Sequence, residues 1–195
     1  MKVGTKSLLF GVHQIILHPI FVMIAWWKLY GFPNKIQYWI AFIVHDWGYW
    51  GKPNMDGKEG ETHVELGANI MHKLFDDKAK VKNCGRGRSI YTGESFYWYN
   101  FTLYHSRFYA KRNERPISKL CVADKYAFCI PPKWLYMLLV NISGEIDEYM
   151  TTSRIRVGKN ILTDKSAWYD YVYNYMQDWI KEHKDNLNDT WTKIK

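Results

Sequence analysis

KIQYWIAFIVHDWGYWGK, residues 35–52, joins a strongly apolar segment to a His-Asp pair. Apolar side chains at nearly every position predict a buried helix from Lys35 to about Asp46. In such a helix Asp46 follows Ile43 and Phe42 by three and four positions, so its carboxylate projects from an apolar face. Because burying an unpaired carboxylate costs several kcal/mol, we expect a cation beside Asp46.

Asp124 presents the same problem in a second apolar segment, residues 117–129, where its neighbours at helical spacing are apolar. An ion pair with Lys or Arg, or protonation, would explain either acid alone. Histidines in similar apolar surroundings, at His18, His45 and His63, favour a shared metal cation instead. Imidazole and carboxylate ligands suit Mn, Fe, Co, Ni or Zn, and no cysteine spacing selects zinc.

The rest of the chain predicts an all-α protein, because apolar residues recur at helical spacing and strand signals are scarce. We expect a single-domain helical bundle over residues 1–195, with a core over about 8–150 and a C-terminal helix, 165–182, packed on it. A glycine-rich loop follows the His-Asp pair at 47–60. The six to seven expected helices cover about 8–30, 35–46, 61–75, 94–110, 117–129, 133–150 and 165–182.

Composition sets further bounds on the class of protein. An apolar fraction of 47% excludes a disordered chain, and 195 residues suit one domain. The net charge of +8 attracts anions, but the basic residues are scattered, so nucleic acid is not the expected partner. Three cysteines without a CxxC pair favour a reducing cytoplasm. The apolar run in residues 1–27 is interrupted by polar residues and Pro19, so we expect no transmembrane segment.

The ordered residues His18 in HPIFVMIA, His45-Asp46 in HDWGYWG and Asp124 in CVADKYAF resemble the HD superfamily of metal-dependent phosphohydrolases. The resemblance spans about 13–128 and implies an HD-type helical fold in which these four residues bind a divalent transition metal. His63, and His105 in LYHSRFYAKR, occupy places similar to the extra ligands of two-metal members. The resemblance thus leaves one or two ions open.

One position departs from the family pattern. Many members carry Glu or Lys three positions after the Asp, where this chain has Tyr49, so the proton-transfer residue is unassigned. Lys52 and Glu61, from the following loop, are the catalytic candidates. Tyr49 itself is a candidate to stack on a base, although packing of the loop would explain it equally well.

Two basic residues follow His105 and are candidates to bind substrate phosphate, namely Arg107 and Lys111. A solvated basic face is the alternative for both. The function implied is a nucleotidase or phosphodiesterase that cleaves a phosphomonoester or phosphodiester bond in a nucleotide or related small molecule. The alternative is a non-catalytic HD-type module that sequesters a nucleotide. A homo-oligomer is possible.

Overall fold

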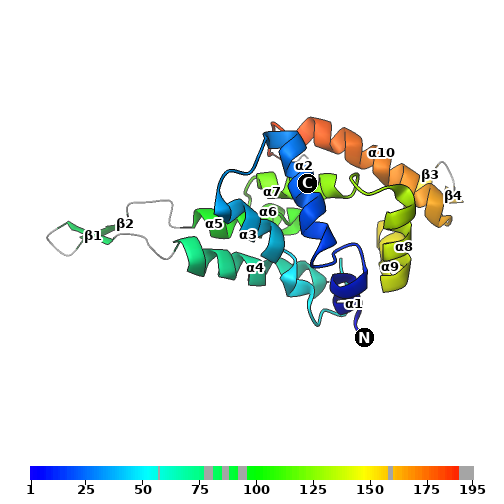
Figure 1. Ribbon diagram of the computed structural model, residues 1–195, viewed down its shortest axis with the longest axis horizontal. Helices are drawn as coiled ribbons and strands as arrows, with labels where there is room; N and C mark the ends of the chain where they lie inside the picture. Colours follow the sequence, from blue (N-terminus) through cyan, green and yellow to red (C-terminus); the bar gives the residue numbers. More distant parts are fainter. Residues whose placement is uncertain (57, 77–80, 85–87, 92–95, 158–159, 189–195) are drawn as a thin grey trace.

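The protein is described by a computed structural model that covers residues 1–56, 58–76, 81–84, 88–91, 96–157 and 160–188 (Figure 1). These residues confirm the all-α prediction. The α-helices are α1 Val3–Phe10, α2 Leu17–Tyr30, α3 Ile36–Val44, α4 Val64–Met71, α5 Tyr97–Leu103, α6 Arg107–Arg112, α7 Lys119–Ala127, α8 Lys133–Ser143, α9 Glu145–Ser153 and α10 Lys165–His183.

Shorter elements complete the described chain. Single turns of 3₁₀ helix, η1 Trp47–Tyr49 and η2 Gly60–His63, bound the loop that follows α3, and a π turn, η3 His72–Asp76, extends α4. Two antiparallel hairpins pair β1 Val81–Cys84 with β2 Arg88–Tyr91, and β3 Arg156–Val157 with β4 Asn160–Ile161.

The described chain has ten α-helices rather than six or seven, because three of the expected helices are each divided in two. The segment 133–150 breaks at Gly144, whose φ of 83° is left-handed and ends α8. The segment 94–110 breaks before Ser106, whose hydroxyl accepts a hydrogen bond from the Tyr109 N–H and starts α6. The segment 8–30 breaks at 11–16, where the Val12 N–H turns to the Glu145 carboxylate.

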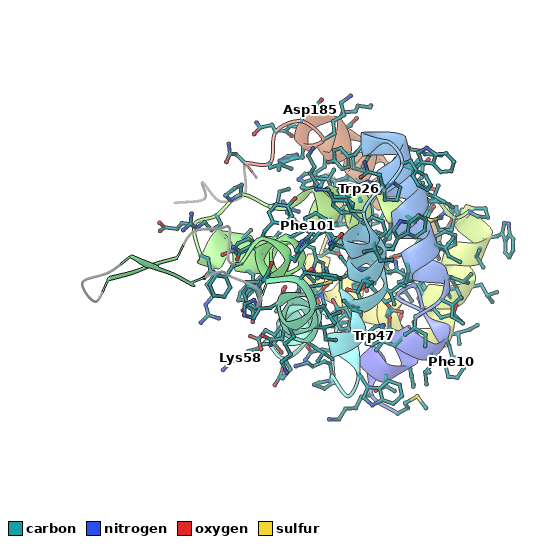
Figure 2. The ribbon with its side chains drawn as sticks, turned by 60° about the vertical axis from the view of Figure 1, so that its left-hand side comes forward. Phe10, Trp26, Trp47, Lys58, Phe101 and Asp185 are labelled. Carbon is teal, nitrogen blue, oxygen red and sulfur yellow. The ribbon has the colours of Figure 1, made fainter. Side chains whose placement is uncertain are left out.

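The central core lies where α2 packs along α7 and α4 packs along α5. Trp26 and Phe101 meet edge to face there, with ring centroids 5.8 Å apart, inside the helical body (Figure 2). Phe42 of α3 is almost fully buried in the same cluster, which stabilises the fold by roughly 1.5–3 kcal/mol. The long helix α10 packs on α7 and α9, so the C-terminal part covers one side of the α2–α7 pair.

None of the described helices has the length and apolar character that a membrane crossing requires.

Candidate metal centre

Six ionisable side chains converge in the interior from two α-helices and three helix junctions. His18 lies in the first turn of α2, His45 and Asp46 follow α3, and Asp124 lies in α7. Five of the six are classed as buried, and the sixth, Asp124, has only 10% of its side chain exposed. The converging residues are His18, His45, Asp46, His63, His105 and Asp124.

The local sequence explains how His63 reaches Asp46. Gly48 lies against the backbone of η2, and a Cβ at this position would stand 1.9 Å from the His63 carbonyl oxygen. Only glycine therefore allows η1 and η2 to approach so closely. The glycine-rich loop after the His-Asp pair thus has a structural purpose, which is to carry His63 back to the end of α3.

The first set of ligand atoms surrounds one oxygen of Asp46. His18 Nε2 lies 3.1 Å from Asp46 Oδ2 and 3.0 Å from Asp124 Oδ1. His45 Nε2 lies 3.2 Å from His18 Nε2 and 3.3 Å from Asp46 Oδ2. Atoms that bind one ion at about 2.1 Å lie roughly 3 to 4 Å apart, so these four residues fit a common cation.

The second set surrounds the other oxygen of Asp46. His63 Nε2 and His105 Nε2 each lie 3.5 Å from Asp46 Oδ1, and 3.3 Å from one another. Asp46 Oδ2, in the first set, is buried and makes no hydrogen bond to the described residues. An orphaned carboxylate oxygen among imidazole nitrogens is explained by a cation, and the Asp46 carboxylate can bridge two of them.

The imidazole rings are held in the form that binds metal. Nδ1 of each of three histidines donates to a backbone carbonyl three positions earlier: His45 to Phe42 at 3.0 Å, His63 to Gly60 at 2.8 Å and His105 to Thr102 at 2.5 Å. With the Nδ1 proton engaged in this way, a neutral ring presents the Nε2 lone pair. All three lone pairs face the Asp46 carboxylate.

The electrostatics of the cluster also call for a cation. Burial would raise the pKa of Asp46, but the charge of His45 and the other imidazoles close to the carboxylate hold that pKa well below its usual range. Burial would lower the pKa of His45, yet Asp46 and Asp124 raise it to about 10. At His63 burial outweighs Asp46 and lowers the pKa to about 3. Without a metal, a proton on His45 thus offsets the ionised carboxylates, and a metal ion would replace it.

A cavity of about 600 Å³ opens beside the cluster. His18, Asp46 and Asp124 belong to its polar lining. Other parts of its lining come from α7 to α10 and are largely apolar and aromatic, including Phe128, Tyr136, Trp168, Tyr171 and Met176. Its volume lies in the range of small-molecule sites, and its mixed lining suits a compound with one charged and one flat apolar part.

His13, which the sequence leaves equally open as a core histidine or a substrate contact, lines the cavity. Its Nδ1 lies 2.9 Å from Oε2 of the fully buried Glu145 and 3.0 Å from the Ser7 hydroxyl. The Glu145 carboxylate also accepts from the Tyr149 hydroxyl at 2.9 Å and the Ser143 hydroxyl at 2.6 Å. Burial would lower the pKa of His13, but the hydrogen bond and charge of Glu145 raise it above its usual value.

Lys125 is a cavity residue that the sequence did not identify as a site residue. Its Nζ lies 3.2 Å from Asp124 Oδ2, and although burial would lower its pKa, Asp124 raises it above the usual value. Lys125 therefore brings a stable positive charge to the polar lining of the cavity. The Lys in CVADKYAF, within the run typical of the resemblance, is the signal that could have identified it.

The five other candidate site residues from the sequence differ in whether they line the cavity. Tyr49, Glu61 and Arg107 line the cavity, whereas Lys52 and Lys111 are absent from its lining. The Lys52 amine donates to the Thr62 hydroxyl, and Lys111 is exposed on α6. The roles assigned to all five stay predictions.

Tyr49 and Glu61 flank the second set of ligands. The Tyr49 ring stacks on His63 with centroids 3.8 Å apart, and burial raises its pKa well above the usual value. Glu61 Oε2 accepts from the Ser106 hydroxyl at 3.3 Å, and burial, with Asp56, raises its pKa. The Tyr49 phenol therefore stays neutral.

Comparisons with family models, with curated proteins and with solved structures give no match. The case for a metal centre is carried by the arrangement of its ligands.

Proposed function

We propose that the protein is an HD-type, metal-dependent phosphohydrolase that cleaves a phosphomonoester or phosphodiester bond in a nucleotide or related small molecule. One observation carries the proposal: the Asp46 carboxylate lies between two histidine sets, with Oδ2 at 3.1 Å from His18 Nε2 and Oδ1 at 3.5 Å from His105 Nε2. A bridging carboxylate between nitrogen ligands suits two transition-metal ions of the series Mn, Fe, Co, Ni and Zn.

The ligands divide between the two ions. His18, His45 and Asp124 would hold one, His63 and His105 the other, and Asp46 both. When bound, such ions supply hydroxide near neutral pH and polarise a phosphoryl group. The negative charge of the cluster is low, because Asp46 and Asp124 are the only carboxylates in the two sets and the other four ligands are histidines.

The phosphate would be bound at the polar lining of the cavity by Arg107 and Lys125. Both line the cavity, and negative charge on the phosphoryl oxygens grows as the leaving group departs. The Arg107 guanidinium lies 5.0 Å from the centroid of the Trp179 ring, which limits its orientations. A forked donor held in this way is suited to two oxygens of one phosphate.

The leaving oxygen needs a proton, and we assign the donation of this proton to His13. His13 lines the same cavity as the metal ligands, and its ring centroid lies 5.2 Å from that of His18. Its Nδ1 is taken by Glu145, so Nε2 is the atom left for substrate. The catalytic role falls to His13, and Glu145 is a positioning residue. Lys52 is engaged with Thr62 instead.

The aromatic part of the cavity lining supports a nucleoside as the organic part of the substrate. Aromatic rings from α7 to α10 offer faces for a flat base, and burial of such a base contributes both apolar area and stacking. A large cellular polymer is a poorer fit to a cavity of about 600 Å³.

The test is product formation from a panel of nucleotides and cyclic dinucleotides, followed by chromatography, with protein loaded separately with Mn, Co, Ni or Zn. A phosphomonoester should give free phosphate, and a phosphodiester should give a linear nucleotide. Asp46→Asn should abolish turnover, because it removes the shared anionic ligand. Asp178→Asn, on the exposed face of α10, is the matched control and should turn over normally. If the wild type forms no hydrolysis product with any metal, the hydrolase proposal fails. Recovery of unchanged, bound nucleotide would then support sequestration.

A further inference from the structure

The outer sides of α2 and α3 carry large apolar side chains that no described part of the chain covers. On α2, Ile16, Ile20 and Trp27 are separated by four and seven positions and share one helix face. On the α3 side, Ile36, Ile43 and Trp47 are separated by seven and four positions and also share one face. We call these six residues and Phe32 the apolar stripe. Each is 40–65% exposed.

The two halves of the stripe are continuous. The Trp27 and Phe32 rings lie edge to face with centroids 5.8 Å apart, and Phe32 contacts Trp39 of α3 at 5.9 Å. The short connection between the helices therefore joins both faces into one surface. The inner sides of α2 and α3 are apolar as well, since Trp26 and Phe42 belong to the central core. Helices that are apolar on both sides are normally buried on both.

We propose that a second copy of this chain covers the apolar stripe, so that the protein is a two-fold dimer with α2 and α3 of each protomer at the interface. The first support is area. Seven large side chains near half exposure present on the order of 600 Å², and their half-buried neighbours add to it. A stable interface buries about 800 Å² on each partner.

Charge supports a second copy over a membrane. Between residues 7 and 45 the charged residues are Lys28 and Lys35, which flank the connection at one end of the stripe. A two-fold axis through the middle of the stripe places the lysines of the two protomers at opposite ends, so like charges do not meet. The centre is free of charge, as interface cores are. Membrane-surface helices instead carry basic residues along their length.

The stripe is separate from the candidate metal centre. None of its seven residues lines the cavity, although the neighbouring Phe21 of α2 does. Dimerisation can therefore be tested independently of the proposed function, with helix content from far-ultraviolet circular dichroism as a sign of correct folding.

The experiment measures mass by sedimentation equilibrium over a concentration series. Wild type should have twice the chain mass of 23.3 kDa. The double variant Ile20→Glu/Ile43→Glu buries two carboxylates at the interface and should weaken dimerisation by about 100-fold or more. Ile142→Glu is the matched control, because Ile142 is equally exposed, at 55%, on α8. It should remain dimeric. If the glutamates disturb folding, Ile20→Ser/Ile43→Ser should give a smaller shift in the same direction.

Three results would overturn the proposal. First, wild type could be monomeric at every concentration. If that monomer bound to phosphatidylcholine–phosphatidylglycerol vesicles, the apolar stripe would be assigned to membrane binding. Second, the double variant could keep the helix content of the wild type and remain as dimeric as wild type. Third, Ile142→Glu could dissociate the dimer while the double variant does not, which would place the interface on α8.

Discussion

His13 Nδ1 lies 2.9 Å from Glu145 Oε2, although 132 positions separate the two residues. The carboxylate is fully buried and is held by the Ser143 and Tyr149 hydroxyls as well. Such a fixed carboxylate orients the imidazole and stabilises its protonated form. The pair therefore combines the two properties of a proton donor: a defined position at the cavity and a raised pKa.

Replacing His13 tests its catalytic role. If it protonates the leaving oxygen, His13→Gln should lower kcat by about 10²–10⁴-fold, the usual contribution of general acid catalysis. Bound metal should not change, because His13 belongs to neither ligand set. The measurement pairs steady-state kinetics with metal analysis of the same samples. His72→Gln, at a histidine outside the cavity lining, is the control. Loss of metal from His13→Gln would assign it a structural role instead.

Glu145→Gln tests the positioning role through the pH dependence of kcat. Glu145 raises the pKa of His13, so its removal should lower that pKa. A general acid is active when protonated, and activity is lost as pH rises through its pKa. The decline of kcat on the alkaline side should therefore move to lower pH in Glu145→Gln. Glu182→Gln, at an exposed glutamate of α10, should leave the profile unchanged. A uniform loss of kcat without this movement would argue against the pairing.

The fold was predictable from the sequence to the level of helical segments, because apolar spacing along each segment is a local property. The positions at which these segments divide into separate helices were not predictable. The residues around Gly144 in the sequence do not show that it adopts the left-handed φ of 83° that ends α8, and this is seen only in the structure. Ser106 is a similar case. The sequence does not show whether this serine lies within a helix or begins one, and its role as the start of α6 is seen only from the hydrogen bond that the Tyr109 N–H donates to its hydroxyl.

The buried cluster of histidines and aspartates was predictable because ionisable residues on apolar helix faces are anomalous. Asp46 and Asp124 stand out for that reason, and His18 and His45 lie beside them. What the sequence could not show is which oxygen of Asp46 faces which histidine. Nor could it pair His13 with Glu145, since neither residue departs from a pattern on its own and their contact depends on the packing of α1 and α8.

Metal stoichiometry tests the bridging position of Asp46. Wild type should bind two ions per chain. His63→Ala and Asp124→Ala should each retain one ion, from opposite sets, whereas Asp46→Ala should lose both because its two oxygens serve both sets. Elemental analysis after dialysis measures the content, with exposed Asp178→Ala as the control. Two ions retained by Asp46→Ala would contradict the bridge, and one ion in wild type would reduce the centre to a single site.

Arg107 and Lys111 offer a test of phosphate binding, since both are basic residues of α6 and only Arg107 lines the cavity. Arg107→Ala should lower kcat/KM by about 10²-fold, as removal of one donor to a developing anion does. Arg107→Lys should recover part of the loss, because it restores the charge without the fork. Lys111→Ala should stay within about twofold of wild type, as surface substitutions do. Equal losses of kcat/KM in Arg107→Ala and Lys111→Ala would instead indicate that a basic face attracts the substrate in general. Such an attraction would also weaken steeply with added salt.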